Sequence, residues 1–135
     1  MVSAGSQVTD IGTVPTPTVY WAEKQLHLDA GIQITGSHNP VEWNGVKMSL
    51  QGHPFYGKDI QRLWNFVSSD GPQAKRGQAE RGRCSKIDVT KDYVKDIVAR
   101  FRLKKPLKIV LDCGNGVGSL VGAEILRGIG ALVIP

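Results

Sequence analysis

The sequence predicts an α/β fold, with a mixed or parallel sheet and flanking helices. Along the chain, short runs of alternating or continuous apolar residues, typical of strands, alternate with longer segments of helical periodicity. Where a strand, a helix and a second strand follow one another, a parallel crossover is expected. The composition, 41% hydrophobic and 21% charged over 135 residues, is that of a globular protein.

The first elements form such a series. Residues 7–11 are expected to form a short strand. Thr16 suits the N-cap of a helix over about residues 17–28, which begins with a proline, and Gly31 is suited to ending it. Residues 32–35 then place two isoleucines on one face of the next strand, which predicts a parallel crossover.

The middle of the chain begins with an Asn-Gly turn at residues 44–45. The strand that follows, residues 46–50, alternates apolar and polar residues and carries Lys47 on its polar face. Residues 58–68 have the spacing of an amphipathic helix, whose apolar side chains we expect in the core. Residues 69–86 are polar, basic and glycine-containing, and we expect a surface loop.

The last third predicts a further helix and a second crossover. Apolar residues recur at helical spacing over residues 93–101, and Pro106 ends this segment and marks a junction. Residues 107–112 are expected to form a buried strand, followed by a glycine-containing turn, a helix to about Gly128 and a strand at 131–134.

Charge and composition restrict the class of protein. No apolar run approaches the roughly 20 residues that span a bilayer, and no basic and apolar leader begins the chain. Cys84 and Cys113 stand in no metal-ligand spacing, so we expect a reduced, cytoplasmic protein without a membrane partner. The net charge of +5 suits nucleic acid, an anionic membrane surface or small anionic substrates, and does not choose among them.

The glycine-containing turn after residue 112 could bind a dinucleotide, but its spacing argues against this. A G-x-G-x-x-G pattern begun at Gly114 meets Ser119 in its last place, and one begun at Gly116 meets Val121. We expect a close-packed turn between strand and helix.

Ser37, in a short polar loop, could be the nucleophile of a hydrolase or the carrier of a phosphoryl group. A nucleophile elbow needs glycine where Thr35 and Asn39 stand, and we expect the adjacent His38 to be poorly placed to accept the serine proton. A phosphoryl group on Ser37 would need cationic and hydrogen-bonding neighbours, which His38 and Lys47 can supply, and a metal to neutralise charge. On composition alone, an ordinary polar loop remains the alternative.

At these residues the sequence resembles the alpha-D-phosphohexomutase family, specifically its bacterial phosphomannomutase/phosphoglucomutase branch. The resemblance rests on three segments with matching order and spacing. They are the Pro-Thr-Pro at residues 15–17, GIQITGSHNPVEWNGVKMSL at residues 31–50, and KIVLDCGNGVG at residues 108–118.

The resemblance implies that Ser37 is a phosphoserine that exchanges its phosphoryl group with a hexose phosphate. It places His38 and Lys47 at positions implicated in proton transfer, with Lys47 favoured as the general acid and base. It also implies that Mg²⁺ binds partly through the phosphate on Ser37, and that a hexose 1,6-bisphosphate is the intermediate and activator. By the same match, the phosphate loop is shaped by three further residues, Thr35, Asn39 and Asn44.

By the same resemblance, residues 1–105 correspond to an incomplete first domain of a four-domain phosphohexomutase, and residues 106–135 to the start of the second. The family's aspartate-rich metal loop and its sugar-reading segments do not occur in the sequence. We therefore expect a fragment that is inactive alone. Glucose and mannose phosphates are the favoured substrates, glucosamine phosphate remains open, and the sequence does not indicate an oligomeric state.

The rival interpretation is a non-catalytic module that binds anions or nucleic acid through the basic loop at residues 75–86. This loop lacks the interleaved aromatic residues on which bases stack, so we expect a solvated loop and no nucleic-acid partner.

Overall fold

The computed structural model describes residues 1–69 and 80–134. The chain divides into two compact units, one made of Met1–Asp10 and Glu23–Ile87, the other of Ile11–Ala22 and Asp88–Pro135. The division falls within helix α1 (Thr16–Gln25), so neither unit is a continuous stretch of sequence. The expected boundary at residues 105 and 106 concerns the domains of a longer enzyme and stays a prediction.

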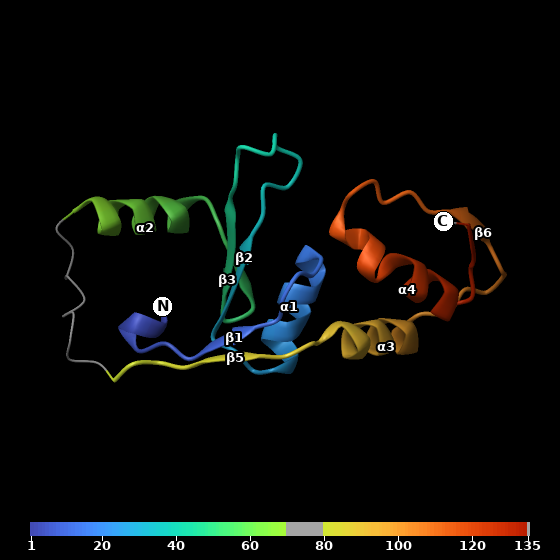
Figure 1. Ribbon diagram of the computed structural model, residues 1–135, viewed down its shortest axis with the longest axis horizontal. Helices are drawn as coiled ribbons and strands as arrows, with labels where there is room; N and C mark the ends of the chain where they lie inside the picture. The colour runs from blue at the N-terminus through green and yellow to red at the C-terminus, as the bar shows by residue number, and fades with distance from the viewer. Residues whose placement is uncertain (70–79, 135) are drawn as a thin grey trace. The chain divides into compact units, whose positions relative to one another are not determined.

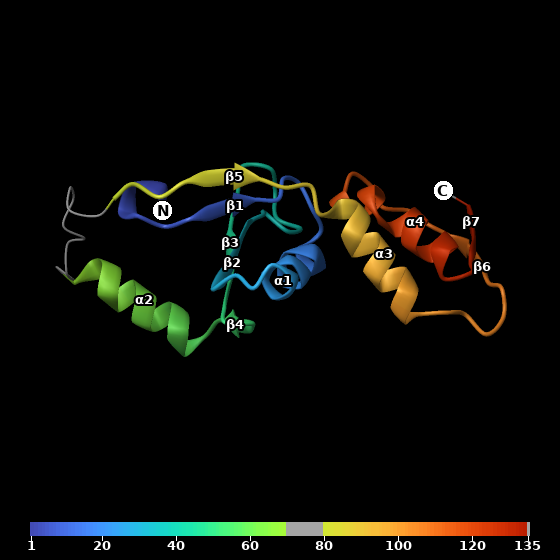
Figure 2. The ribbon, with the colours of Figure 1, turned by 90° about the horizontal axis from the view of Figure 1, so that it is seen from below.

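The first unit begins with a short 3-10 helix, η1 (Val2–Ala4), and a two-stranded sheet. Strands β1 (Val8–Asp10) and β5 (Cys84–Lys86) pair in parallel and lie side by side in Figure 2. The strand predicted at residues 7–11 is confirmed, but the predicted loop over residues 69–86 is wrong at its end, where β5 forms. Strand β5 consists of three residues, Cys-Ser-Lys, and so is too short to show an apolar alternation that could predict it.

Part of the basic segment assigned to that loop, Lys75 and Arg76, lies outside the described residues. Arg81, Arg83 and Lys86, farther along the segment, are exposed. The Nζ atom of Lys86 lies 3.7 Å from Oδ2 of Asp10, across the β1–β5 pair. The described part of the segment is therefore a solvated edge of the first unit.

The second sheet of this unit is antiparallel, with strand order β2-β3-β4. Its strands are β2 (Ala30–Ile34), β3 (Val46–Leu50) and β4 (His53–Phe55), and Figure 1 shows β2 and β3 as a long hairpin. The strands predicted at 32–35 and 46–50 are thus confirmed. The parallel crossover predicted from the first strand to the second is wrong, because β1 and β2 belong to different sheets and β2 pairs with β3, its near neighbour in sequence.

Helix α1 ends earlier than the glycine signal predicts. His27 has a positive φ of 51°, and the Leu28 N–H donates to the Glu23 carbonyl at 2.9 Å, a combination that ends helices. Gly31, the predicted stop, is instead a buried residue of β2, paired with Ser49.

The β2–β3 hairpin turns its apolar side chains toward solvent. Ile32, Ile34, Val46 and Leu50 share one face and are 43%, 63%, 55% and 48% exposed. Ser49, on the opposite face, is buried and hydrogen-bonded to Glu23 of α1. The polar face of this hairpin is therefore the better covered one.

Helix α2 (Lys58–Ser68) has the predicted bounds and follows Gly57, whose φ is 55°. The expectation that its apolar residues form core is wrong. Leu63 is 38% exposed and Trp64 66% exposed, and Ile60 and Val67 are exposed as well. Helical periodicity predicts a face that can be buried, but it does not supply the element that covers the face.

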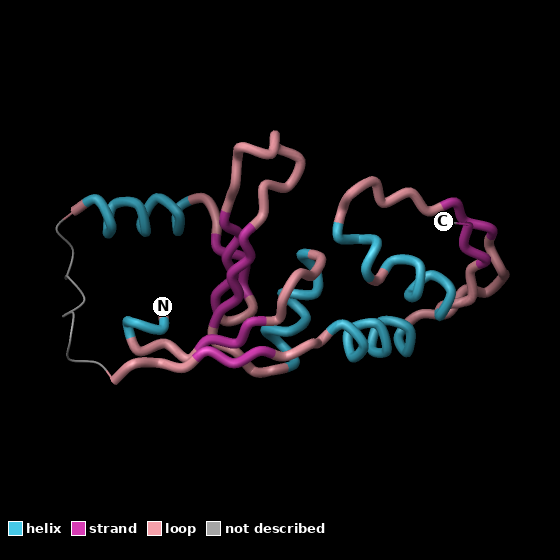
Figure 3. Tube along the Cα trace, viewed as in Figure 1, coloured by secondary structure: helices cyan, strands magenta, loops and turns pink. Residues whose placement is uncertain are grey.

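The second unit contains the second crossover as predicted, but the expectation that its first strand is buried is wrong, because Leu107 and Val110 are 52% and 76% exposed. Strands β6 (Lys108–Val110) and β7 (Leu132–Ile134) pair in parallel and are joined through η2 (Val117–Leu120) and α4 (Gly122–Gly128). Figure 3 shows these strands and helices by type. The core packs around α3 (Thr90–Arg100) and consists of Tyr93, Val94 and Val121, with Trp21, Ile97, Val98 and Ile125 packed against them.

A close approach between α3 and α4 depends on Gly128. A methyl group at this position would overlap the side chain of Val98, which is stiff because it is branched at Cβ. We expect Gly128→Ala to lower the free energy of unfolding by about 1–3 kcal/mol, the usual cost of overpacking. Thermal unfolding of Gly128→Ala alone and combined with Val98→Ala measures this; an equal loss in both backgrounds would contradict the overlap.

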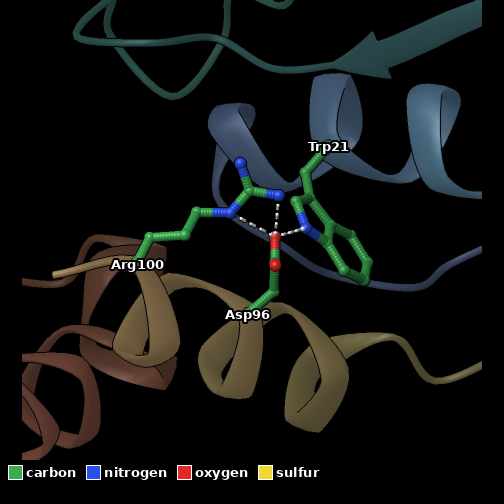
Figure 4. Close-up of polar contacts among 3 residues, drawn as sticks. All are labelled: Trp21, Asp96 and Arg100. Carbon is green, nitrogen blue, oxygen red and sulfur yellow. Dashed lines mark hydrogen bonds and ion pairs between the residues drawn. The ribbon is translucent and has the colours of Figure 1, made fainter.

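Within the second unit, three side chains meet at one carboxylate oxygen (Figure 4). Asp96 Oδ2 accepts hydrogen bonds from Trp21 Nε1 at 2.7 Å and from Arg100 Nε at 3.0 Å, and Arg100 Nη2 lies 2.8 Å from it. The Trp21 ring also packs edge-on against Tyr93, with centroids 5.6 Å apart. The hydrogen bond from Arg100, followed by that from Trp21, holds the pKa of Asp96 below its ordinary value of 3.8.

This arrangement predicts an acid-sensitive contribution to stability. Because the pKa of Asp96 is depressed by folding, its contribution is present above pH 3.8 and lost as the pH falls through the lower pKa of the folded state. Asp96→Asn should therefore unfold at a lower temperature than wild type at neutral pH, and the difference should narrow below pH 3.8. Thermal unfolding followed by tryptophan emission checks this, with Asp29→Asn, an exposed carboxylate, as control.

Among the residues that the structure describes, no helix is both long and apolar enough to span a bilayer.

Candidate functional site

The predicted site residues lie together on the β2–β3 hairpin and on the loop that joins its strands, at the top of the view in Figure 1. In the ladder, Ile34 pairs with Val46 and Gln33 with Lys47. The Thr35 N–H donates to the Gly45 carbonyl at 2.9 Å, which extends the ladder by one step. The loop is therefore closed at its base by the two strands that carry it.

Two consecutive turns build the loop itself. The Asn39 N–H donates to the Gly36 carbonyl at 2.9 Å, and the Trp43 N–H donates to the Pro40 carbonyl at 2.9 Å. Ser37 occupies the second position of the first turn with φ of 54°, in the left-handed region that few non-glycine residues adopt. Its N–H donates to Thr35 Oγ1 at 3.0 Å, which helps to hold this conformation. The side chain of Ser37 is exposed.

The loop is narrow where its two arms meet, at a neck formed by Gly36 and Gly45. A Cβ atom at Gly36 would lie 2.8 Å from the Trp43 carbonyl oxygen, and one at Gly45 would lie 2.9 Å from that of Thr35. The Gly45 N–H also donates to Asn44 Oδ1 at 2.9 Å. The neck thus needs little side-chain volume on either arm. The Asn-Gly pair in the sequence indicates a turn, but nothing in the sequence indicates that Gly36 and Gly45 approach the opposite arm so closely.

Ser37 and His38 are within hydrogen-bonding distance, with Ser37 Oγ 3.1 Å from His38 Nδ1. The expectation that an adjacent histidine is poorly placed is therefore wrong. Side chains of successive residues in extended backbone point to opposite faces, whereas the left-handed Ser37 brings the two together. With Nδ1 unprotonated, His38 accepts a hydrogen bond from the serine hydroxyl. Within residues 1–69 and 80–134, no carboxylate is bonded to His38, so a hydrolytic triad is not assembled there.

Lys47 shares a face of the hairpin with Thr35. Lys47 lies opposite Gln33, so Thr35 is its diagonal neighbour across the ladder, at about 7–8 Å between Cα atoms in such pairs. Gly45, opposite Thr35, adds no side chain to this face. The Lys47 side chain is exposed, and within residues 1–69 and 80–134 it is not hydrogen-bonded to the Ser37 loop.

The described residues around the Ser37 loop do not form a complete metal site. The structure describes no group of three or more His, Cys, Asp or Glu side chains that could hold an ion in residues 1–69 and 80–134. Asn39 contributes a backbone turn hydrogen bond, and Asn44 accepts one at the neck. The loop therefore offers a serine oxygen and an imidazole, and strand β3 adds the amino group of Lys47, a set suited to holding and transferring an anionic group.

The family model, the curated relatives and the solved structure that match this chain all point to the same family. Residues 1–74 match the family described as phosphoglucomutase/phosphomannomutase, alpha/beta/alpha domain I. A phosphomannomutase/phosphoglucomutase of Pseudomonas putida is 36% identical over all 135 residues, and a phosphoglucomutase of Neisseria meningitidis serogroup B is 37% identical over 94% of the chain. A crystal structure of a phosphoglucomutase/phosphomannomutase family protein from Burkholderia thailandensis covers 98% of the chain with a TM-score of 0.81 and 35% identity.

The chain covers only part of the length of each of these relatives. The chain spans 28% of the Pseudomonas putida relative, 27% of the Neisseria relative and 30% of the Burkholderia structure. The family match includes the whole β2–β3 hairpin and the Ser37 loop. On these findings, the chain belongs to the phosphoglucomutase/phosphomannomutase family.

Proposed function

We propose that the protein to which this chain contributes is a phosphohexomutase, which moves a phosphoryl group between the 1- and 6-positions of a hexose phosphate. The observation that carries the proposal is the Ser37 loop. It holds an exposed serine in a strained, hydrogen-bonded turn, with His38 Nδ1 3.1 Å from its hydroxyl oxygen. Residues with strained backbone angles persist only where the surrounding structure holds them in place. Such residues are found most often at functional sites.

In the proposed reaction, phosphorylated Ser37 gives its phosphoryl group to a free hydroxyl of the hexose phosphate. The Ser37 O–P bond breaks and a sugar O–P bond forms. The uncharged amine of Lys47 accepts the proton of the sugar hydroxyl, and protonated His38 donates a proton to the departing Ser37 oxygen. In the second half, the other sugar O–P bond of the hexose 1,6-bisphosphate breaks and a Ser37 O–P bond forms. The Ser37 proton passes to His38 Nδ1, 3.1 Å away, and Lys47 returns its proton to the departing sugar oxygen. These roles are those of general acid and base catalysts, and they require that Lys47 reach the sugar hydroxyl when the substrate is bound.

Mg²⁺ is part of the proposal, with one ligand from this chain. A phosphate oxygen on Ser37 fits the preference of Mg²⁺ for oxygen ligands, but residues 1–69 and 80–134 hold no carboxylate cluster to complete the site. Bound there, the ion would neutralise charge on the transferred group. Because the remaining ligands would come from elsewhere, we propose that these 135 residues alone show no turnover.

For the substrate we propose glucose or mannose phosphate, in a cytoplasmic enzyme. The relatives support this choice by their names, phosphomannomutase/phosphoglucomutase and phosphoglucomutase. A probable phosphoglucosamine mutase of Methanothermobacter thermautotrophicus is 34% identical over 99% of the chain. Similarity over this part of the protein therefore does not separate the sugars.

The state of Ser37 in cells tests the proposal. We expect the full-length protein, isolated without phosphatase treatment, to carry one phosphoryl group on Ser37, because the proposed cycle begins from the phosphoserine. Intact mass and peptide mapping measure this, and incubation with hexose 1,6-bisphosphate should raise the phosphorylated fraction. Peptides in which Ser37 is always unmodified, before and after incubation, would exclude the mechanism.

A further inference from the structure

A buried carboxylate lies on the polar face of the same hairpin. Glu23, in the last turn of α1, is 3% exposed. Its Oε2 accepts a hydrogen bond from the hydroxyl of Ser49, also 3% exposed, and its Oε1 accepts one from the Gly52 N–H at 2.8 Å. One side chain thus contacts strand β3 and the turn that follows it.

Among the described residues, no cationic side chain is paired with this carboxylate. Glu23 takes part in no ion pair within the two described stretches of the chain. A buried carboxylate is costly unless it is hydrogen-bonded or paired, and apolar residues of similar volume often serve stability as well or better. A contribution to packing alone therefore does not explain why a carboxylate is buried at this position.

The turn that Glu23 holds is itself strained. Gln51 and Gly52 have φ of 51° and 76°, and they join Leu50 to His53 across the β3–β4 pair. Gln51 is a non-glycine residue in the left-handed region, which costs about 1–2 kcal/mol. Its N–H donates to the Asp29 carbonyl at 2.8 Å, so two hydrogen bonds, this one and that to Glu23, fix the turn.

We infer that Glu23 is a positioning residue for the Ser37 site, acting through β3, and this inference rests on the proposed function. Ser49 is two residues from Lys47 on the same face of β3, where they pair with Gly31 and Gln33. The anchor at Ser49 and Gly52 fixes one end of β3, and the neck of the loop fixes the other. Lys47 lies between these two fixed points, so its position relative to Ser37 depends on both.

The test compares Glu23→Ala, Glu23→Gln, Ser49→Ala and the double variant Glu23→Ala/Ser49→Ala in the full-length protein, with exposed Lys24→Ala as control. We expect Glu23→Ala to lower kcat ten-fold or more with KM changed less than about two-fold, since a small misplacement of a catalytic group can cost about a hundred-fold. Glu23→Gln keeps an acceptor oxygen and should recover part of kcat. The double variant should lose little more than Glu23→Ala, because Glu23→Ala already removes the hydrogen bond that Ser49 makes to the carboxylate.

Hydrogen exchange measured on the same proteins separates the possible failures. Glu23→Ala should speed exchange in peptides covering residues 46–53, because Gly52 loses its acceptor. Faster exchange with unchanged kcat would reduce Glu23 to a structural role, and unchanged exchange would remove the anchor; either result overturns the inference. If wild type shows no mutase turnover, the proposed function fails and the positioning role with it, while the exchange data still report on the anchor.

Discussion

Replacing Ser37 by alanine is expected to abolish phosphohexomutase turnover in the full-length protein. Alanine lacks the oxygen that carries the phosphoryl group, so neither half of the cycle can proceed through it. For a residue that forms a covalent intermediate, the expected loss in kcat is roughly a thousand-fold or more. A coupled assay that converts glucose 1-phosphate or mannose 1-phosphate to the 6-phosphate, run with added hexose 1,6-bisphosphate, measures it.

The Ser37→Ala variant should remain folded. Ser37 is exposed, and its side chain is bonded only to His38 within the part of the chain that the structure describes. Ser85→Ala, which removes an exposed hydroxyl on β5, is the matched control and should keep wild-type turnover. Turnover retained by Ser37→Ala together with an unchanged unfolding temperature would refute the phosphoserine mechanism.

The elements that local patterns specify are those that the sequence predicted well. Strand β3 shows a period of two after an Asn-Gly turn, and the hairpin it forms with β2 brings residues 35–47 together because they are close in sequence. The candidate site residues, whose roles stay predictions, were assigned from this one local motif and its family resemblance. Strand β5 was missed because it is only three residues long and its pairing with β1 spans the chain from Val8 to Cys84.

Two kinds of feature could not be predicted from the sequence. One is the contacts between elements that are distant along the chain, and the other is the backbone angles of single residues. The exposed apolar faces of the β2–β3 hairpin and of α2 show that periodicity defines a face without defining its partner. The contact of Ser37 with His38 depends on a φ of 54°, which no neighbouring residue type demands. The bond between Glu23 and Ser49 joins residues 26 apart in sequence, and neither residue type marks it.

Lys47→Met should leave substrate binding largely intact but lower kcat by about a hundred- to ten-thousand-fold, the usual contribution of a positioned acid or base. Methionine keeps most of the length of the side chain and removes the ammonium. The change lies on the exposed surface of β3, so the hairpin should persist. Steady-state kinetics of wild type, Lys47→Met and Lys47→Arg, measured across pH, provide the comparison.

The arginine variant decides what Lys47 does. Arginine keeps the positive charge but cannot give up its proton in the accessible pH range, so Lys47→Arg restores activity if the charge alone holds the phosphate. If Lys47 transfers protons, Lys47→Arg should be about as slow as Lys47→Met, while Ser37 still takes up a phosphoryl group from the bisphosphate. Lys24→Met, at an exposed lysine of α1, controls for the loss of one surface charge. Wild-type kcat in Lys47→Met would remove Lys47 from the site, and with it the reason for Glu23 to position β3.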